Sequence, residues 1–116
     1  MRKFSAAILS LAMLAGAAPL AATPARADCY DVYGCTDTDR FRLQDLLDGP
    51  NCNFLWTMRN AIYKERGYCF RTQRGIRAFG NAGCRYDDVE AVPLSAIERG
   101  NVATIQRAER MKACPR

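Results

Sequence analysis

The number and placement of the cysteines limit this chain more than any other feature. All six lie after residue 27, and the chain contains no histidine and no CxxC spacing. Zinc sites are usually built from histidines and closely spaced cysteines. Because this chain lacks both, we predict no metal ion, and we predict no other cofactor. An even set of cysteines in a small exported chain is typical of a disulfide framework. We therefore predict three disulfides and no free thiol. The cysteines are Cys29, Cys35, Cys52, Cys69, Cys84 and Cys114.

Residues 1–27 have the pattern of a secretory signal peptide. A basic start, Met1-Arg2-Lys3, precedes an apolar run rich in alanine and leucine that covers residues 4–22. Ala25-Arg26-Ala27 then provides the small residues that a signal peptidase requires. Pro19 interrupts the apolar run and Pro24 follows it, which argues against a retained membrane anchor. We predict cleavage after residue 27, a periplasmic or secreted location, and no membrane span after cleavage.

The charge is unevenly distributed along the chain. Cleavage would leave 14 basic and 12 acidic residues, so a nucleic-acid partner is not expected. Residues 59–85 nevertheless carry a net charge of +6, between acidic stretches at 28–48 and 86–98. Either the acidic stretches lie over the basic one, or the basic stretch is an aromatic-studded patch for an anionic ligand. The candidate binding residues are Arg71, Arg74, Arg77, Arg85, Tyr68 and Tyr86.

Apolar spacing and turn residues predict an all-α, disulfide-stapled domain with three to four short helices. Strand alternation and internal repeats are absent after residue 27. The first helix is expected to follow a cap at Asp39. The central helix is expected to begin at an Asn51 or Asn53 cap and to end at Gly67. The expected helices cover residues 40–48, 54–66, 73–79 and 96 to about 112.

Capping residues support the last two helices. Thr72 can cap the third helix, which we expect to bury Ile76 and Phe79. Ser95 and Glu98 fit a capping box, in which each side chain bonds to the other residue's backbone N–H. The last helix is therefore the one whose start is best marked in the sequence.

The order of the helices also indicates a disulfide pairing. Cys69 and Cys84 flank the third helix, so a bridge would hold its two ends together. Cys52 precedes the central helix and Cys114 follows the last, and antiparallel packing of these helices brings the two cysteines close. Cys29–Cys35 is then the remaining pair. We predict this scheme among the many pairings that six cysteines allow.

Arg59 lies on the apolar side of the central helix. At about 100° per residue it projects between Leu55 and Tyr63, which belong to the two halves of the apolar face. Glu109 falls in the same way on the face that contains Ile105 in the last helix. A buried charge requires a partner or access to water. We therefore predict a partly buried Arg59–Glu109 pair with a structural role. The alternatives are an Arg59 that extends to solvent or one that binds a ligand.

Residues 58–70 (MRNAIYKERGYCF) carry a resemblance to a known family. Leu55-Trp56, the segment 79–84, and Leu94-Ser95 followed by Glu109 add to it. Together these residues resemble the YARHG domain, which is a small extracytoplasmic bacterial domain. The resemblance implies an exported helical domain and does not imply a particular activity.

The resemblance covers about residues 52–114, which we interpret as a YARHG-like domain. Residues 28–51 are then a polar N-terminal extension with a short helix. Only Tyr63 and Gly67 match the five letters of the naming motif, and Arg66 replaces its histidine. A role that depends on that histidine does not carry over to this chain.

The side-chain inventory argues against most catalytic mechanisms. Histidine is absent, and the one serine after residue 27, Ser95, is better used as a helix cap. Paired cysteines do not act as thiol nucleophiles. A carboxylate-based hydrolase, with Asp87 and Asp88 as the obvious pair, is a remote alternative. We expect a protein that is not an enzyme.

Two non-catalytic classes remain. The first is a cell-envelope binding or interaction module whose partner is an anionic glycan or an envelope protein. The second is a small secreted structural or protein-interaction protein without a glycan ligand. Binding that is lost at high ionic strength would favour the first class.

Overall fold

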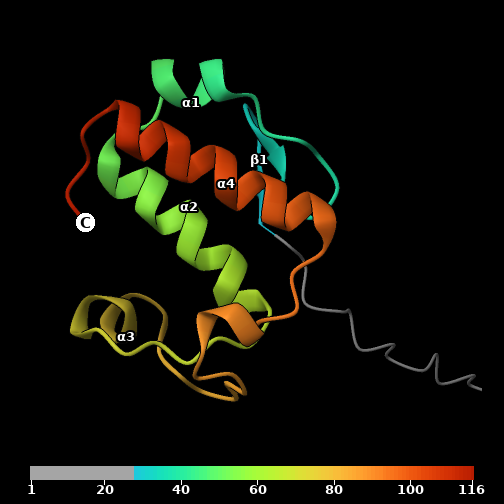
Figure 1. The fold of residues 1–116 in the computed structure, drawn as a ribbon, viewed down its shortest axis with the longest axis vertical. Coiled ribbons are helices and arrows are strands. Elements are labelled where there is room, and N and C mark those ends of the chain that lie inside the picture. The colour runs from blue at the N-terminus through green and yellow to red at the C-terminus, as the bar shows by residue number, and fades with distance from the viewer. Residues whose placement is uncertain (1–27) are drawn as a thin grey trace, which may run out of the picture.

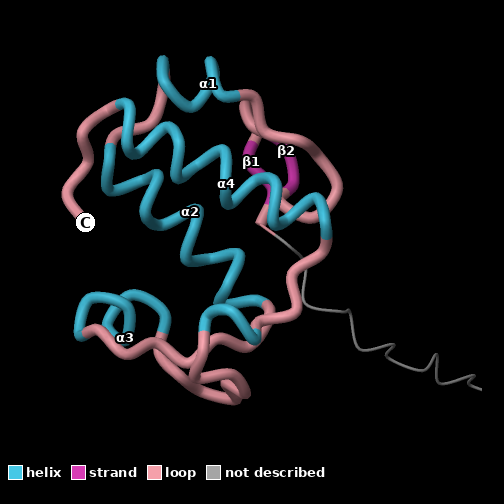
Figure 2. The backbone as a smooth tube through the Cα atoms, in the orientation of Figure 1, coloured by secondary structure: helices cyan, strands magenta, loops and turns pink. Residues whose placement is uncertain are grey.

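The computed structural model describes residues 28–116, and the predicted signal peptide lies outside this range. The described part is mostly helical with one small sheet, as Figures 1 and 2 show. Its elements in order are β1 (Cys29–Tyr30), β2 (Gly34–Cys35), α1 (Leu43–Asp48), α2 (Cys52–Glu65), α3 (Gln73–Phe79), the 3-10 helix η1 (Val89–Ala91) and α4 (Ala96–Met111). From residue 28 onwards, no helix is both long and apolar enough to cross a membrane.

The two longest helices have predicted caps and end within one residue of the prediction, although α2 begins at Cys52, two residues before the predicted start at residue 54. The Asn51 side chain accepts a hydrogen bond of 2.8 Å from the Phe54 N–H and caps α2. After α2 the chain turns at Gly67, whose φ of 93° is in the left-handed region that favours glycine. At the start of α4, Ser95 and Glu98 form both hydrogen bonds of the capping box.

The core lies between α2 and α4. These helices run side by side, with α1 next to α4 on one side of the pair and α3 next to α2 on the other (Figure 1). Leu55, Met58 and Ile62 of α2 and Ile105 of α4 are at most 1% exposed, and so is Leu46 of α1. Each such side chain stabilises the fold by about 1.5–3 kcal/mol relative to exposure. The α2–α4 pair is therefore the frame on which the other elements are placed.

The N-terminal part differs from the prediction in two ways. A helix capped by Asp39 over residues 40–48 is wrong, because α1 begins later and has no side-chain cap. The Asp39 carboxylate instead accepts a 2.7 Å hydrogen bond from the Cys35 N–H. The Phe41 N–H donates to the Asn101 side chain at 2.8 Å, and this bond holds the backbone before α1 outside the helix.

The second difference is a short hairpin in a chain predicted to be all-α. β1 and β2 pair in antiparallel register, with Cys29 opposite Cys35. Its aromatic side chains pack on α2: the ring centroids of Tyr30 and Tyr33 lie 5.6 and 6.4 Å from that of Phe54. Strands of two residues are too short to produce an alternating pattern in the sequence.

The segment 28–51 belongs to the folded core. Phe41 is 6% exposed and packs in the same cluster as the helices. At the far end of the segment, the Lys112 ammonium donates to the carbonyl oxygens of Leu47 and Pro50, at 3.1 and 2.7 Å. Describing this segment as an extension therefore understates its role.

The third helix has the predicted bounds but buries a different face. Thr72 caps α3 by accepting a hydrogen bond from the Gly75 N–H. The prediction that Ile76 is buried is wrong, because Ile76 is 44% exposed. Gly75 faces inward instead, and a Cβ at this position would lie 2.7 Å from the Phe70 ring. Phe79 is partly buried and stacks on Phe70, with ring centroids 5.0 Å apart.

Three disulfides close the structure in the predicted pairing. Cys52 joins Cys114 and so links the start of α2 to the residues after α4. Cys69 joins Cys84 across α3, and Cys29 joins Cys35 across the hairpin. All six cysteines are therefore paired.

Candidate binding surface

Three arginines lie close together in the sequence around α3, with no acidic residue between them. We call residues 69–84 the α3 lobe. It contains Arg71, Arg74 and Arg77, all exposed, and no acidic residue. Arg74 is held in place, because its guanidinium carbon lies 3.8 Å from the Trp56 ring centroid and its Nη2 donates to Asn53 at 2.8 Å. Arg71 and Arg77 form no ion pair within residues 28–116. Their role in binding stays a prediction.

A row of aromatic rings fixes the α3 lobe on α2. Trp56 packs on Phe79, Phe79 on Phe70, and Phe70 on Tyr68, with ring centroids 5.0–5.9 Å apart. Tyr68 in turn packs on Tyr63 of α2 at 6.0 Å. Such contacts add to the stability gained from burying the rings. The lobe thus has an aromatic core that is distinct from the aliphatic core between α2 and α4.

Polar contacts close the lobe as well. The Asn81 side chain accepts from the Phe70 N–H at 2.7 Å and donates to the Phe70 carbonyl at 2.9 Å. The Lys64 ammonium donates to the Gly80 carbonyl at 3.2 Å. Together with the Cys69–Cys84 bridge, these bonds hold both ends of α3. The exposed arginines are therefore presented by a preorganised backbone.

The remaining candidate residues form a second group around Gly67. The backbone N–H groups of Arg85 and Tyr86 both donate to the Gly67 carbonyl, and the Cys69 N–H donates to the Tyr86 carbonyl. Tyr68 and Tyr86 are only partly exposed, whereas Arg85 is exposed. The two tyrosines thus pack under the surface more than they contribute to it. The structure divides the predicted patch between the α3 lobe and this turn.

The predicted Arg59–Glu109 pair is present. Arg59 Nε donates to Glu109 Oε1 at 2.6 Å, and its Nη2 donates to Oε2 at 3.1 Å. The two side chains are 23% and 13% exposed. This pair joins α2 to α4 at the edge of the core, and a cavity lies beside it.

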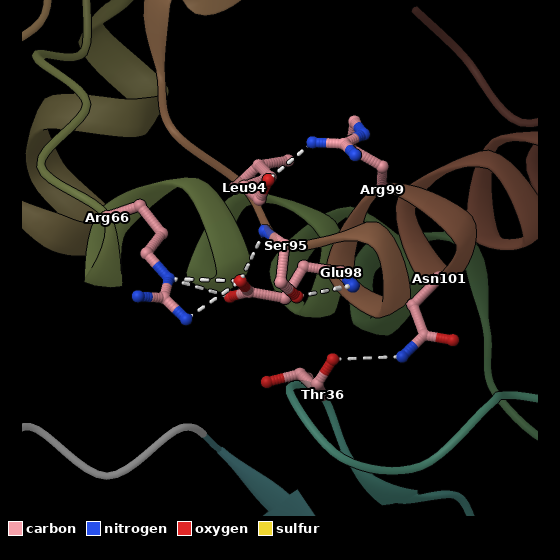
Figure 3. Close-up of polar contacts among 7 residues, drawn as sticks. All are labelled: Thr36, Arg66, Leu94, Ser95, Glu98, Arg99 and Asn101. Carbon is pink, nitrogen blue, oxygen red and sulfur yellow. Dashed lines mark hydrogen bonds and ion pairs between the residues drawn. The ribbon is translucent and has the colours of Figure 1, made fainter.

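A second interhelical ion pair is not found by sequence reasoning. Arg66 at the end of α2 lies 2.8 Å from the Glu98 carboxylate of α4 (Figure 3). The Glu98 side chain is only 2% exposed, and it also accepts the Ser95 N–H of the capping box. Burial by itself would raise the pKa of Glu98, but the hydrogen bonds from Arg66 and Ser95 lower it below the ordinary value. Glu98 therefore serves as helix cap and ion-pair partner together.

Asn101 is the other polar residue that sequence reasoning missed. Its side-chain amide donates to the carbonyls of Thr36 and Asp39, at 2.9 and 2.7 Å, and its oxygen accepts from the Phe41 N–H (the bond to Thr36 appears in Figure 3). The position of Asn101 in the helix could have indicated its burial, because Glu98 and Asn101 share the face of α4 that buries Ile105. Polar residues on an apolar face indicate buried partners.

A family model for the YARHG domain matches residues 28–110, which is most of the chain. The chain belongs to the YARHG domain family. The match includes the hairpin and α1 together with the helices that follow. YARHG domains are small and extracytoplasmic, and three disulfides fit an exported protein. No curated protein and no solved structure matches the chain.

The two adjacent acidic residues of this YARHG domain that form the candidate catalytic pair, Asp87 and Asp88, differ in their surroundings. Asp88 caps η1 by accepting the Glu90 N–H at 3.0 Å, whereas Asp87 is exposed. Among residues 28–116, no three metal-ligating side chains gather into a group. The expectation that the protein is not an enzyme stays a prediction.

Glu65 gives the domain a testable pH dependence. Burial, together with the charges of Asp28, Asp37 and Glu98, raises the pKa of Glu65 from 4.5 to about 7, against the opposing effect of Arg66. Between pH 4.5 and about 7, Glu65 thus keeps its proton in the folded protein and loses it in the unfolded chain. Stability from this group is present below pH 4.5 and is lost as pH rises to about 7.

We expect Glu65→Gln to be more stable than the wild type at pH 8, by about 1–2 kcal/mol after allowance for solvent screening. Urea unfolding of both proteins at pH 4.5, 6 and 8 measures the difference. The difference should grow with pH, because only the wild type has to ionise a carboxyl in this position. A difference that is the same at all three pH values contradicts the assignment.

Proposed function

We propose that this protein is a non-catalytic, exported binding module whose ligand is an anionic glycan of the cell envelope. The observation that carries the proposal is the α3 lobe, a stapled segment with three exposed arginines and no acidic residue. An export route delivers the protein to the compartment where such glycans are present.

Arginine suits this role for geometric reasons. Its guanidinium presents paired N–H donors that match the oxygens of carboxylate and phosphate groups. Arg71 and Arg77 are exposed without a competing carboxylate on the lobe, whereas Arg74 lies over Trp56. Contacts of this kind at an exposed surface are individually weak and screened by salt. A polymer with repeated negative charges contacts several arginines at the same time, and its affinity rises for this reason.

Binding to purified sacculi and to soluble anionic envelope glycans tests the proposal. We expect wild-type protein to sediment with sacculi at low salt and to be released at about 0.5 M salt. The double variant Arg71→Gln and Arg77→Gln should lose this binding while melting like the wild type.

A matched control removes the same charge elsewhere. Arg42 and Arg107 are exposed and have no ion pair within the described chain. Their double change to glutamine should keep most of the binding. Equal loss in both double variants would show that only net charge matters, and binding that survives high salt would contradict the glycan proposal.

One observation favours the second class, a structural or protein-interaction protein without a glycan ligand. Ile76 is 44% exposed on α3, between the exposed arginines. Ile76→Ser should leave glycan binding unchanged but weaken contact with a protein partner. A different outcome is that the wild type captures an envelope protein at high salt and the Ile76→Ser variant fails to capture it. That outcome would show that the ligand is a protein and not a glycan.

A further inference from the structure

A cavity of about 360 Å³ lies beside the Arg59–Glu109 pair, and none of the arginines of the α3 lobe lines it. Its wall combines Arg59 of α2, three residues of α4, and the C-terminal residues 114–116. The α4 residues are Gln106, Glu109 and Arg110. The volume is at the small end of the range of ligand pockets, and it suits a small molecule or the end of a larger one.

Arg59 is the fixed charged group in this cavity. Its Nε and Nη2 bind the Glu109 carboxylate, so one edge of the guanidinium is occupied. Within residues 28–116, its third nitrogen, Nη1, takes part in no hydrogen bond. The side chain is 23% exposed, and Glu109 fixes its orientation. A guanidinium held in this way keeps donors for a ligand and loses little conformational freedom on binding.

The rest of the wall adds positive charge and an apolar surface. Arg110 and Arg116 are exposed and form no ion pair among the described residues. With Arg59 they place three arginine side chains beside Glu109, which is the one acidic side chain in this wall. Cys114, which is in the disulfide to Cys52, and Pro115 supply a stretch of wall without charge. A ligand would fit this cavity if it carried an anionic group, which the arginines would bind, on a short uncharged stem, which would lie against the uncharged part of the wall.

We propose that this cavity binds a small oxyanion, a carboxylate or phosphate group carried on a short uncharged stem. Arg59 contacts the oxyanion, Arg110 and Arg116 close over it, and Glu109 is a positioning residue that orients Arg59. The site uses none of the arginines of the α3 lobe, so it stands or falls independently of the glycan proposal.

Trp56 provides an optical readout, and the variants below assign the response to the cavity. It is the only tryptophan of the chain and lies three residues before Arg59 on α2, so the two side chains are neighbours. The purified, disulfide-bonded protein is titrated with N-acetylglycine in one arm and methyl phosphate in the other, with chloride at equal ionic strength as the reference. We expect a saturable change in tryptophan fluorescence beyond the chloride response, and the arm that gives it identifies the oxyanion.

Variants connect the response to the cavity. Arg59→Gln should weaken binding at least about tenfold, and so should the double variant Arg110→Gln and Arg116→Gln, which changes only exposed side chains. Arg107→Gln, an exposed arginine of α4 outside the cavity, is the matched control and should change binding less than about twofold.

Glu109→Gln separates positioning from simple electrostatics. Removing a negative charge beside the cavity would strengthen anion binding if Glu109 acted only through its charge. Loss of the Arg59 orientation should weaken binding instead, and circular dichroism and thermal melting confirm that the variant is folded. The proposal is overturned if neither probe saturates beyond the chloride response, if Arg110→Gln with Arg116→Gln binds like the wild type, or if Glu109→Gln binds more tightly.

Discussion

Changing both Cys52 and Cys114 to alanine is expected to lower the free energy of unfolding by about 4 kcal/mol. The bridge joins residues 62 apart in the sequence, so it removes a large loop entropy from the unfolded chain. It also joins the start of α2 to the end of α4, the two helices that enclose the core. Urea unfolding monitored by far-ultraviolet circular dichroism measures the loss.

The other bridges give an internal scale for this effect. Removing Cys69–Cys84, with a separation of 15, should cost about 3 kcal/mol, and removing Cys29–Cys35, with a separation of 6, about 2 kcal/mol. The expected order therefore follows loop length. If loss of the hairpin bridge destabilised the protein more than loss of Cys52–Cys114, loop entropy would not be the main contribution.

Arg66→Ala is expected to destabilise the protein by about 3 kcal/mol at neutral pH. It leaves the Glu98 carboxylate buried without its cation, and breaking a buried pair from one side commonly costs about 3–5 kcal/mol. The lower end applies here, because the Arg66 side chain is 42% exposed and only Glu98 is fully buried. Chemical unfolding at pH 7 measures this loss.

The two residues of the Arg66–Glu98 pair should differ in how much their substitution lowers the free energy of unfolding, and the loss should depend on pH. Glu98→Gln keeps acceptor and donor atoms beside Ser95 and removes the buried charge, so it should cost less than Arg66→Ala. In the wild type the low pKa of Glu98 contributes stability above its ordinary pKa, and this contribution is lost as pH falls. In Arg66→Ala the Glu98 carboxyl loses the Arg66 hydrogen bond that lowers its pKa, so we expect a pKa above that of the wild type and a deficit that shrinks on acidification. A deficit that is constant from pH 7 to pH 4 would count against this account of the pair.

The frame of the fold was predictable because several local signals agree with one another. The caps at Asn51 and Ser95 and the glycine after α2 fix the ends of the main helices. With both helices placed, antiparallel packing brings Cys52 to Cys114 and Arg59 to Glu109. Each of these contacts follows from helix periodicity together with the antiparallel packing of the two longest helices.

The parts that escaped prediction depend on contacts between distant segments. Asn101 binds backbone groups about 60 residues away, and no local pattern shows which carbonyls it will meet. That contact also holds Phe41 outside α1, so the start of the helix was misplaced. Ile76 was expected inside because apolar residues usually are, yet Gly75 is what allows Phe70 to approach α3 closely. The α3 arginines were identifiable as a basic group, but the cavity beside Arg59 arises only when three chain segments meet.

The nesting of one disulfide inside another has a consequence for oxidative folding. In order along the chain, the third cysteine pairs with the sixth and the fourth with the fifth. A chain that crosses a membrane with its N-terminus first and is oxidised as it emerges would join Cys52 to Cys69 before Cys114 arrives. The native pairing then requires a thiolate to attack that bridge and exchange it, a reaction that takes seconds to hours without an efficient catalyst. Maturation of a chain exported in this way should therefore depend on a disulfide isomerase as well as on the oxidase that makes the first bridges.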